Sequence, residues 1–337
     1  MWAGRWLGRH LLLKDRAHGH VRHRLRVISL GCFAAIARTH TVRNPHSVSS
    51  FNQVVIEEFR ANAGRVGGPF EGSELILLTT TGARSGKPHT VPLGFVREDR
   101  ESGQGNGGGD GGHLLVVGSA AGADRHPAWY HNLLARPLVQ VETGSEEYGA
   151  VAVPAEGARR DELFAHVVRA APGYGGYQAG TARVIPVVTL QRTHATPAGE
   201  GGIAGKLLDV HGWLRAQLTL VRDLVREEEP RGGTASLGLQ LRQHCLAFCH
   251  SLEFHHRSED AGLFPYLEQQ HPHMREFFRR IGAEHRVIAR LQEELVRALD
   301  APGAGFSERV ERMSRELEAH LDIEEAQLLP VLRALEA

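Results

Sequence analysis

The spacing of apolar residues changes near residue 200, and this change divides the chain into two kinds of structure. Between residues 51 and 193, short apolar runs with strand-like spacing are separated by glycine-rich turns. From residue 206 onward, apolar residues recur every three or four positions, as in amphipathic helices. We therefore predict a strand-rich domain over 51–193, a linker over 194–205 and an all-α domain over 206–337.

Length and composition fit two globular domains. The 337 residues are 42% hydrophobic, and their 39 basic side chains are balanced by 39 acidic ones. This balance argues against a globally basic protein that binds nucleic acid. No apolar run is long enough to span a membrane, and three cysteines cannot build a disulfide framework. We expect no nucleic-acid partner, no transmembrane segment and a cytoplasmic protein, either free or peripheral to a membrane.

The first fifty residues differ from the rest. They contain nine Lys or Arg residues and a single acidic residue, Asp15, and they show little periodicity. A basic extension without stable structure explains this composition best. A targeting signal or a basic arm for an acidic partner is the alternative. We assign no function to residues 1–50.

The strand-rich domain is predicted to be a small barrel or sandwich. A helix is expected over 51–63 and another over 161–171. The glycine-rich segment 103–112 is typical of a hairpin tip. Short strands with few helices favour an antiparallel barrel or sandwich. Strands are expected over 75–80, 90–96, 114–118, 138–142, 148–154 and 185–190.

One motif in this domain could bind an anion. In TTTGARSGK, residues 79–87, glycines permit a tight turn, while hydroxyl groups and two cations surround it. From spacing alone, an ordinary polar hairpin turn is the favoured interpretation. The motif is not a nucleotide-binding P-loop, because the required glycine and lysine spacing is missing.

Two aromatic motifs leave alternatives open. HPAWYHN, residues 126–132, could contact a flat heterocycle, or it could begin a helix with Trp129 in the core. In YGGY, Tyr174 and Tyr177 could line a pocket, or they could support a loop.

Together these motifs resemble the deazaflavin-dependent nitroreductase family of split β-barrel proteins. The resemblance rests on FNQVVIEEFRANAGRVGGPFEG, LLTTTGARSGKPHTVPL, HPAWYHNLLARP and PGYGGYQAGTARVIPVVTL, in that order over about 140 residues. It implies a split β-barrel (α+β) and the reduced deazaflavin coenzyme F420 as hydride donor. It also implies a small-molecule acceptor such as a quinone, nitroaromatic or enone. Split barrels often pair, so a homodimer is compatible with the resemblance.

The resemblance also implies roles for individual residues. Arg84, Ser85 and Lys87 would hold the coenzyme's phosphate and acidic tail, and Pro92 and Leu93 would meet the edge of its ring. His89 stands where a permanent cation is common in the family. Gly94 and Ala171 stand where the family can have aromatic residues, which would widen the acceptor pocket. The implied coenzyme-binding residues are Arg84, Ser85, Lys87, His89, Pro92, Leu93, Trp129 and Asn132, and the implied catalytic residues are Tyr174, Tyr177 and Ser119.

The second domain is predicted to be an antiparallel four-helix bundle. Helices are expected over 206–228, 237–268, 272–300 and 307–335, with a bend near 262–265 in the second. Long helices with short connections are typical of such bundles.

A repeated His–Glu pattern indicates a metal site in this bundle. His255 and Glu259, like His320 and Glu324, are four residues apart and so share a helix face. His211 and His285 fall within apolar stripes of the other two helices. Any one of these histidines is best explained by the surface or by a hydrogen bond. The six polar groups together in a core would be costly without a shared cation. The predicted metal ligands are His211, His255, Glu259, His285, His320 and Glu324.

This pattern resembles the hemerythrin-like HHE cation-binding domain, which implies a non-haem di-iron centre with bridging carboxylates. The departure is on the third helix, where Ile281 and Ala289 occupy the positions open to a second histidine. The site would keep an open coordination position or borrow His256, Asp260 or Glu325.

The leading hypothesis is an F420H2-dependent oxidoreductase whose di-iron domain binds O2, NO or peroxide. The alternative is an iron or oxygen sensor, or a storage protein, in which the barrel only binds the deazaflavin. A barrel that prefers an ordinary flavin is a third interpretation.

Overall fold

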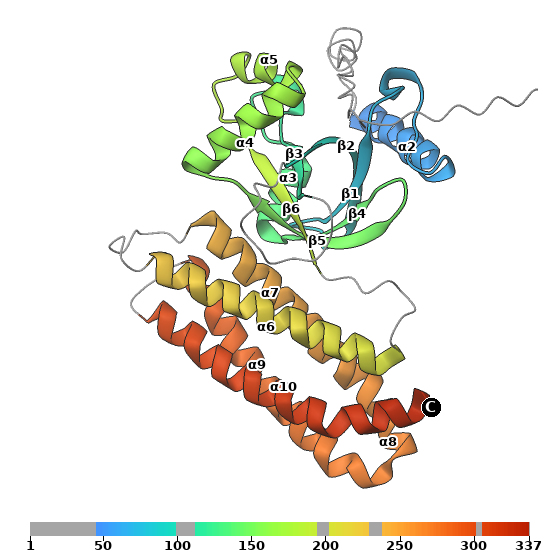
Figure 1. Cartoon of the computed structure of the whole chain (residues 1–337), viewed down its shortest axis with the longest axis vertical. Helices are drawn as coiled ribbons and strands as arrows, with labels where there is room; N and C mark the ends of the chain where they lie inside the picture. The colour runs from blue at the N-terminus through green and yellow to red at the C-terminus, as the bar shows by residue number, and fades with distance from the viewer. Residues whose placement is uncertain (1–44, 99–111, 194–201, 229–237, 301–304, 337) are drawn as a thin grey trace, which may run out of the picture.

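The computed structural model describes residues 45–98, 112–193, 202–228, 238–300 and 305–336. A β-barrel with flanking helices forms the first part, and a bundle of long helices packs beneath it (Figure 1). Residues 1–44 of the extension predicted over 1–50, most of the hairpin tip and most of the linker lie outside the described residues. Residues 45–50 belong to the helix Pro45–Ala61, so the predicted extension is too long. No helix in the described ranges is both long and apolar enough to cross a membrane.

The barrel closes with the strand order β1-β2-β3-β6-β5-β4, and every neighbouring pair is antiparallel. All six predicted strands are present. Each was predicted from a short apolar run, a pattern that depends only on residues close together in the sequence. Their bounds are β1 (Leu75–Thr81), β2 (Pro88–Arg97), β3 (Leu114–Val117), β4 (Leu138–Glu142), β5 (Glu147–Pro154) and β6 (Val187–Arg192).

Helices cover the outside of the barrel. Leu163 and Val167 of α4 pack against β6, and Phe59 of α2 packs against β1. α3 and α5 are not among the predicted elements, because helices of eight and seven residues are too short to show a clear period. The elements are α2 (Pro45–Ala61), η1 (Gly68–Phe70), η2 (Ala120–Gly122), α3 (Ala128–Ala135), α4 (Gly157–Ala170) and α5 (Gly173–Ala179).

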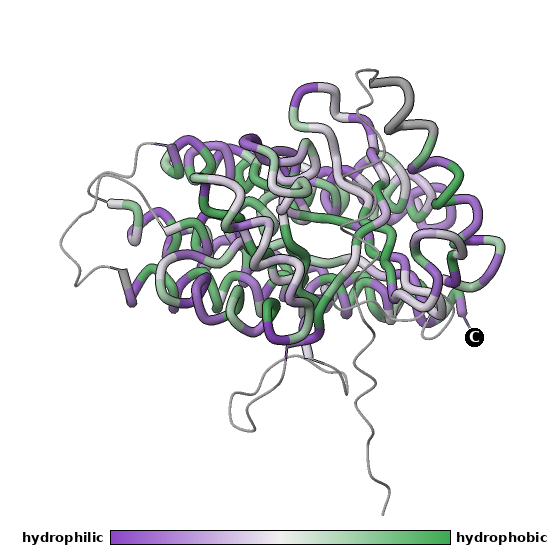
Figure 2. Tube along the Cα trace, turned by 90° about the horizontal axis from the view of Figure 1, so that it is seen from above, coloured by the Kyte–Doolittle hydropathy of each residue, from purple (hydrophilic) through white to green (hydrophobic). Residues whose placement is uncertain are grey.

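Four long helices form the bundle, in which α6 and α9 each contact α7 and α10. Apolar and polar residues alternate along each of them (Figure 2), as the 3.6-residue period predicts. α6 begins at Gly202, so the predicted linker is too long by four residues. The bounds are α6 (Gly202–Glu228), α7 (Leu239–Ser258), α8 (Phe264–Gln270), η5 (Pro272–Met274), α9 (Arg275–Asp300) and α10 (Phe306–Glu336).

The bend predicted near 262–265 is a change of helix type that begins at Glu259. One turn of π-helix, η4 (Glu259–Leu263), separates α7 from α8. Pro265 follows this turn, and because proline lacks an N–H the regular hydrogen-bond ladder cannot pass through it. Widened turns of this kind are frequent at functional sites.

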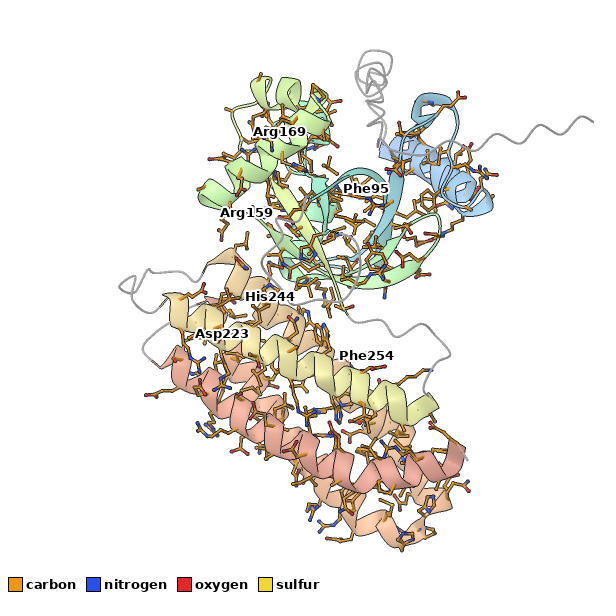
Figure 3. All side chains as sticks on the ribbon, in the orientation of Figure 1. Phe95, Arg159, Arg169, Asp223, His244 and Phe254 are labelled. Atoms are coloured by element: carbon orange, nitrogen blue, oxygen red, sulfur yellow. The ribbon has the colours of Figure 1, made fainter. Side chains whose placement is uncertain are left out.

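The two domains pack through β5 and α7. Successive side chains of a strand point to opposite faces. Accordingly Ala150 and Ala152 face the barrel core, whereas Val151 and Val153 join the core of the bundle. Figure 3 shows side chains between the barrel and α7, with His244 on α7 near this contact.

Two hydrogen bonds reinforce the contact. The backbone N–H of Leu239, the first residue of α7, donates to a Glu156 carboxylate oxygen at 2.6 Å. Gln243 Nε2 donates to the backbone oxygen of Leu134 at 3.3 Å. The barrel domain therefore caps the helix that enters the bundle.

We expect Val151→Asp to destabilise the protein, because it places an uncompensated charge between β5 and α7. The loss should be at least about 2 kcal/mol in the free energy of unfolding, measured by urea denaturation. Val54→Asp on α2 is the control, since Val54 is 62% exposed. Equal stability of the two variants would contradict this account of the interface.

Candidate coenzyme site and metal centre

The turn between β1 and β2 carries the predicted anion motif, and α3 fixes it in place. Within the turn, Gly82 N–H donates to the Lys87 carbonyl at 2.8 Å. Asn132 of α3 accepts a hydrogen bond from Ala83 N–H and donates one to Thr80 Oγ1, both at 3.1 Å. A single amide side chain thus ties the turn to a helix 49 residues away.

Cations and polar groups gather on the exposed side of this turn. Ser85 Oγ lies 3.3 Å from His89 Nε2 and accepts the Lys87 N–H at 3.3 Å. Arg84 and Lys87 are exposed on the same turn. Gly82 is needed beneath it, because an added Cβ would lie 2.3 Å from Ser85 Oγ. This arrangement suits a phosphate or carboxylate group.

β2 differs from its neighbours in the barrel. None of its residues is buried, whereas all of β3 and most of β1 are. Pro92 and Leu93, which the resemblance assigns to the coenzyme ring, are half-buried on this strand. β2 therefore offers accessible backbone and side-chain surface directly beside the cationic turn.

The loop that contains Ser119 is held by an arginine that the sequence did not indicate. Arg183 Nη2 donates to the carbonyl oxygens of Gly118, at 3.0 Å, and Ser119, at 2.6 Å. Ala120 and Ala121 have φ angles of 45° and 52°, which are unfavourable for residues other than glycine. The hydrogen bonds from Arg183 hold the loop in this conformation. Burial lowers the pKa of the Arg183 guanidinium. Its partners are some 65 residues away in sequence, so no local motif could reveal them.

The two predicted catalytic tyrosines lie together beside this loop. Their rings are 6.0 Å apart and nearly perpendicular. α5 packs closely on η2, since a Cβ added at Gly122 would lie 3.3 Å from the Tyr177 carbonyl oxygen. Burial, with a smaller effect of Tyr177, raises the pKa of Tyr174 to about 12. Tyr174 therefore keeps its proton at neutral pH and can donate a hydrogen bond.

Trp129 lies at the start of α3, and its side chain is buried. Its side chain is 7% exposed and packs with Leu133 in the barrel core. The helix-start interpretation of this motif is the one that the structure supports. Trp129 fixes α3, which presents Asn132, and so acts on the coenzyme site through the fold.

The bundle brings all six predicted metal ligands together and adds His256. Their donor atoms form two groups, each within 4.8 Å: His211, His255, Glu259 and Glu324 in one, and His256, His285 and His320 in the other. α6, α7, α9, α10 and the π turn all contribute. The sequence left open which residue replaces the second histidine that α9 lacks. His256 is the candidate whose donor atom lies in the group with His285 and His320.

Two buried carboxylates lie between these groups. Glu324 Oε1 is 3.3 Å from His285 Nε2 and 3.4 Å from His320 Nε2, whereas its Oε2 is 3.5 Å from His211 Nε2. Glu259 Oε2 is 3.5 Å from His255 Nε2 and 3.7 Å from His285 Nε2. Each carboxylate thus faces both groups, as a bridging ligand would.

Outer carboxylates orient three of the histidines. Glu325 contacts Nδ1 of His211 at 2.8 Å, and Asp260 contacts Nδ1 of His285 at 2.9 Å. Glu284 contacts Nδ1 of His320 at 3.1 Å. Such contacts fix the ring and leave Nε2 for a metal. Asp260 and Glu325, which were named above as alternative metal ligands, therefore contact the Nδ1 side of the histidine rings instead. Glu284 has the same role, and the sequence pattern did not predict it.

The chemistry of the cluster fits a pair of cations. Glu259 and Glu324 are 3% and 0% exposed, and Glu259 Oε1, Glu324 Oε2 and His256 Nε2 have no hydrogen-bond partner among the described residues. Burial, and then the charge of Glu324, raise the pKa of Glu259. Burial lowers the pKa of His255 to about 3, which favours the neutral imidazole that binds metals. Cations would satisfy all of these groups.

Known sequences agree with both halves of this picture. Residues 52–192 match the family of F420H2-dependent quinone reductases, and residues 203–332 match the hemerythrin HHE cation-binding domain. An F420H2-dependent quinone reductase of Mycobacterium tuberculosis H37Rv is 35% identical over 140 residues, which are 40% of this chain and 85% of the relative.

Two solved structures are also similar. An F420-H2-dependent reductase named FDR-A is 36% identical over 35% of this chain and 93% of its own, with a TM-score of 0.30. A structure described as a domain-swapped dimer is 32% identical over 44% of this chain and all of its own, with a TM-score of 0.31. The chain, a deazaflavin-dependent oxidoreductase with an added hemerythrin HHE domain, belongs to the F420H2-dependent quinone reductase family.

Proposed function

We propose that the barrel domain, residues 51–193, binds reduced F420 and reduces a quinone, a nitroaromatic compound or an enone. The observation that carries this proposal is the turn of β1–β2, tied to α3 by Asn132 and exposing Arg84 and Lys87. When bound, the coenzyme supplies a hydride.

The side chains of the barrel bind and orient the coenzyme and the acceptor. Arg84, Lys87 and His89 hold the acidic tail, and half-buried β2 contacts the ring through Pro92 and Leu93. The protein must keep donor and acceptor carbons about 3–3.5 Å apart and exclude water. Tyr174 keeps its proton and donates a hydrogen bond to the oxygen of the acceptor as negative charge develops there.

We propose that the bundle binds a pair of iron ions that bind O2, NO or peroxide. Glu259 and Glu324, which lie between the two histidine groups, carry this proposal. Imidazole and carboxylate ligands suit iron better than magnesium or a thiolate-type zinc site. His256 supplies the imidazole that α9 lacks at Ala289. The proposed ligands are His211, His255, His256, Glu259, His285, His320 and Glu324.

The two sites act separately in this proposal. Gln243, where α7 meets the barrel, and His255 are twelve residues apart, which is about 18 Å along a helix. Direct hydride transfer needs contact distances. Transfer of a hydride between the sites would therefore require a diffusing carrier, such as a reduced quinone.

An anaerobic titration of the iron-loaded protein with reduced F420 tests this division. We expect the iron spectrum to stay unchanged until a quinone is added, while the quinone is reduced at the barrel. Bleaching of ferric bands without a quinone would contradict separate sites. Coenzyme binding without turnover on any acceptor would instead favour the sensor or storage alternative.

Removal of the tail-binding cations should weaken coenzyme binding. We expect Arg84→Ala and Lys87→Ala each to raise the KM for F420H2 about 10-fold with little change in kcat, since a charge-assisted hydrogen bond contributes about 1.5–3 kcal/mol. Arg169→Ala, an exposed arginine of α4, is the control. Steady-state kinetics at fixed quinone concentration measure the effect, and a KM equal to that of the control would argue against this tail site.

His256→Ala should reduce iron binding without loss of fold. We expect iron content to fall from about two ions to about one per chain, because one of three imidazoles in its group is lost. Metal analysis after anaerobic reconstitution measures this content. His250→Ala is the control, because His250 lies on α7 outside both groups. Full iron content in His256→Ala would show that His256 is not a ligand.

A further inference from the structure

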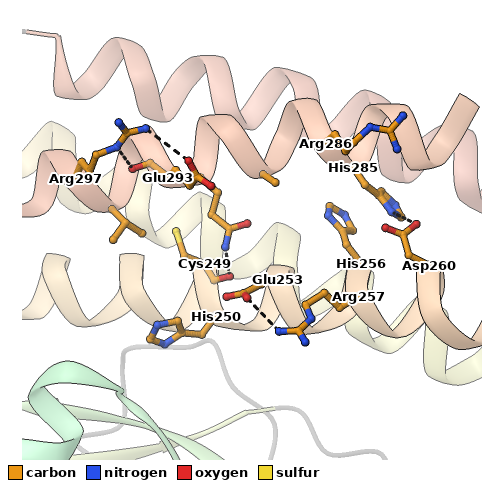
Figure 4. Close-up of a pocket in the computed structure, with 13 residues that line it drawn as sticks. Cys249, His250, Glu253, His256, Arg257, Asp260, His285, Arg286, Glu293 and Arg297 are labelled. Atoms are coloured by element: carbon orange, nitrogen blue, oxygen red, sulfur yellow. Dashed lines mark hydrogen bonds and ion pairs between the residues drawn. The ribbon is translucent and has the colours of Figure 1, made fainter. Parts of the chain in front are cut away.

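A groove lies between α7 and α9, directly over one of the two histidine groups. Its volume is about 780 Å³, and it is lined by residues of these helices and of the π turn. His256 and His285, 5% and 3% exposed, form its floor (Figure 4). The two imidazoles are stacked, with ring centroids 4.0 Å apart, and both belong to the proposed ligand group of His256, His285 and His320.

A small residue on α9 keeps the groove open. Ala289 lines it one helical turn after His285, on the same face of α9. Farther along, Gln292 is buried and donates from Nε2 to the Cys249 carbonyl oxygen at 2.6 Å. Gln292, Cys249 and His250 therefore line one end of the groove, and His256 and His285 line the other (Figure 4).

The charges along the groove leave one cation without an ion-pair partner. Glu253 pairs with Arg257 at 3.5 Å, and Glu293 pairs with Arg297 at 3.7 Å. Asp260 is occupied by His285. Arg286 lines the groove beside His285, and no ion pair joins it to any residue in the described ranges. An unpaired guanidinium beside the floor attracts anions.

We propose that the α7–α9 groove is the access route by which a small anion reaches the metal ion held by His256, His285 and His320. In this route Arg286 attracts the anion and Ala289 leaves room for it. The inference rests on the proposed iron centre. It adds the side from which ligands approach, and to the O2, NO or peroxide proposed above it adds the ligand class that the charge of Arg286 favours, a small anion.

Azide binding to the iron-loaded protein tests the role of Ala289. We expect Ala289→Leu to lower the azide association rate at least about 10-fold, because the larger side chain fills the space above the floor. Iron content should equal that of the wild type. Stopped-flow absorption measures the rate. Ala319→Leu is the control: Ala319 is exposed, next to His320, and outside the groove.

A second variant tests the charge. Arg286→Gln should slow azide association severalfold at low salt and make it less sensitive to ionic strength. Arg290→Gln, an exposed arginine one turn later and outside the lining, should behave like the wild type.

Three outcomes are distinguishable. Slower binding in Ala289→Leu and Arg286→Gln with full iron content supports the groove. Wild-type azide kinetics in both, with full iron content, overturn it, because the anion must then arrive by another path. If the wild-type protein itself retains no iron, the metal centre fails and the groove proposal fails with it.

Discussion

The burial of two carboxylates among five imidazoles is the constraint on which the bundle depends. Glu259 and Glu324 are almost fully buried, and isolated charges in such surroundings are costly. The cost is lowered because the helices bring histidines to both sides of each carboxylate, and cations in the proposed centre would remove it. The register of α6, α7, α9 and α10 is therefore tied to one cluster of side chains, with Glu284, Glu325 and Asp260 fixing the rings from behind.

α7 links this cluster to the reductase domain. Its first residue is capped by Glu156, and Val151 and Val153 of β5 extend the bundle core into the barrel. Its last turn carries His255 and His256. One helix thus joins the barrel to the bundle, and its opposite end carries proposed metal ligands.

The proposed coenzyme site is built differently. Its cations remain exposed, and the buried bonds serve the backbone that presents them. Asn132 fixes the β1–β2 turn, and Arg183 holds the loop around Ser119 against the left-handed angles of Ala120 and Ala121. A site that must admit and release a large anionic coenzyme gains from a rigid frame with accessible charges.

The strands, the long helices, the division near residue 200 and six of the seven clustered residues could all be predicted from the amino-acid sequence. These features depend on spacing within one element. Every second residue of a strand lies on the same face, and residues four apart in a helix lie on the same face. The tertiary structure decided the rest. It alone selected His256 for the cluster and placed Asp260 and Glu325 behind the histidines. It also moved Trp129 into the core and brought Arg183 to its loop. These contacts depend on how the helices and strands pack against one another and on the π turn at Glu259. The spacing of residues within one element does not predict either of them.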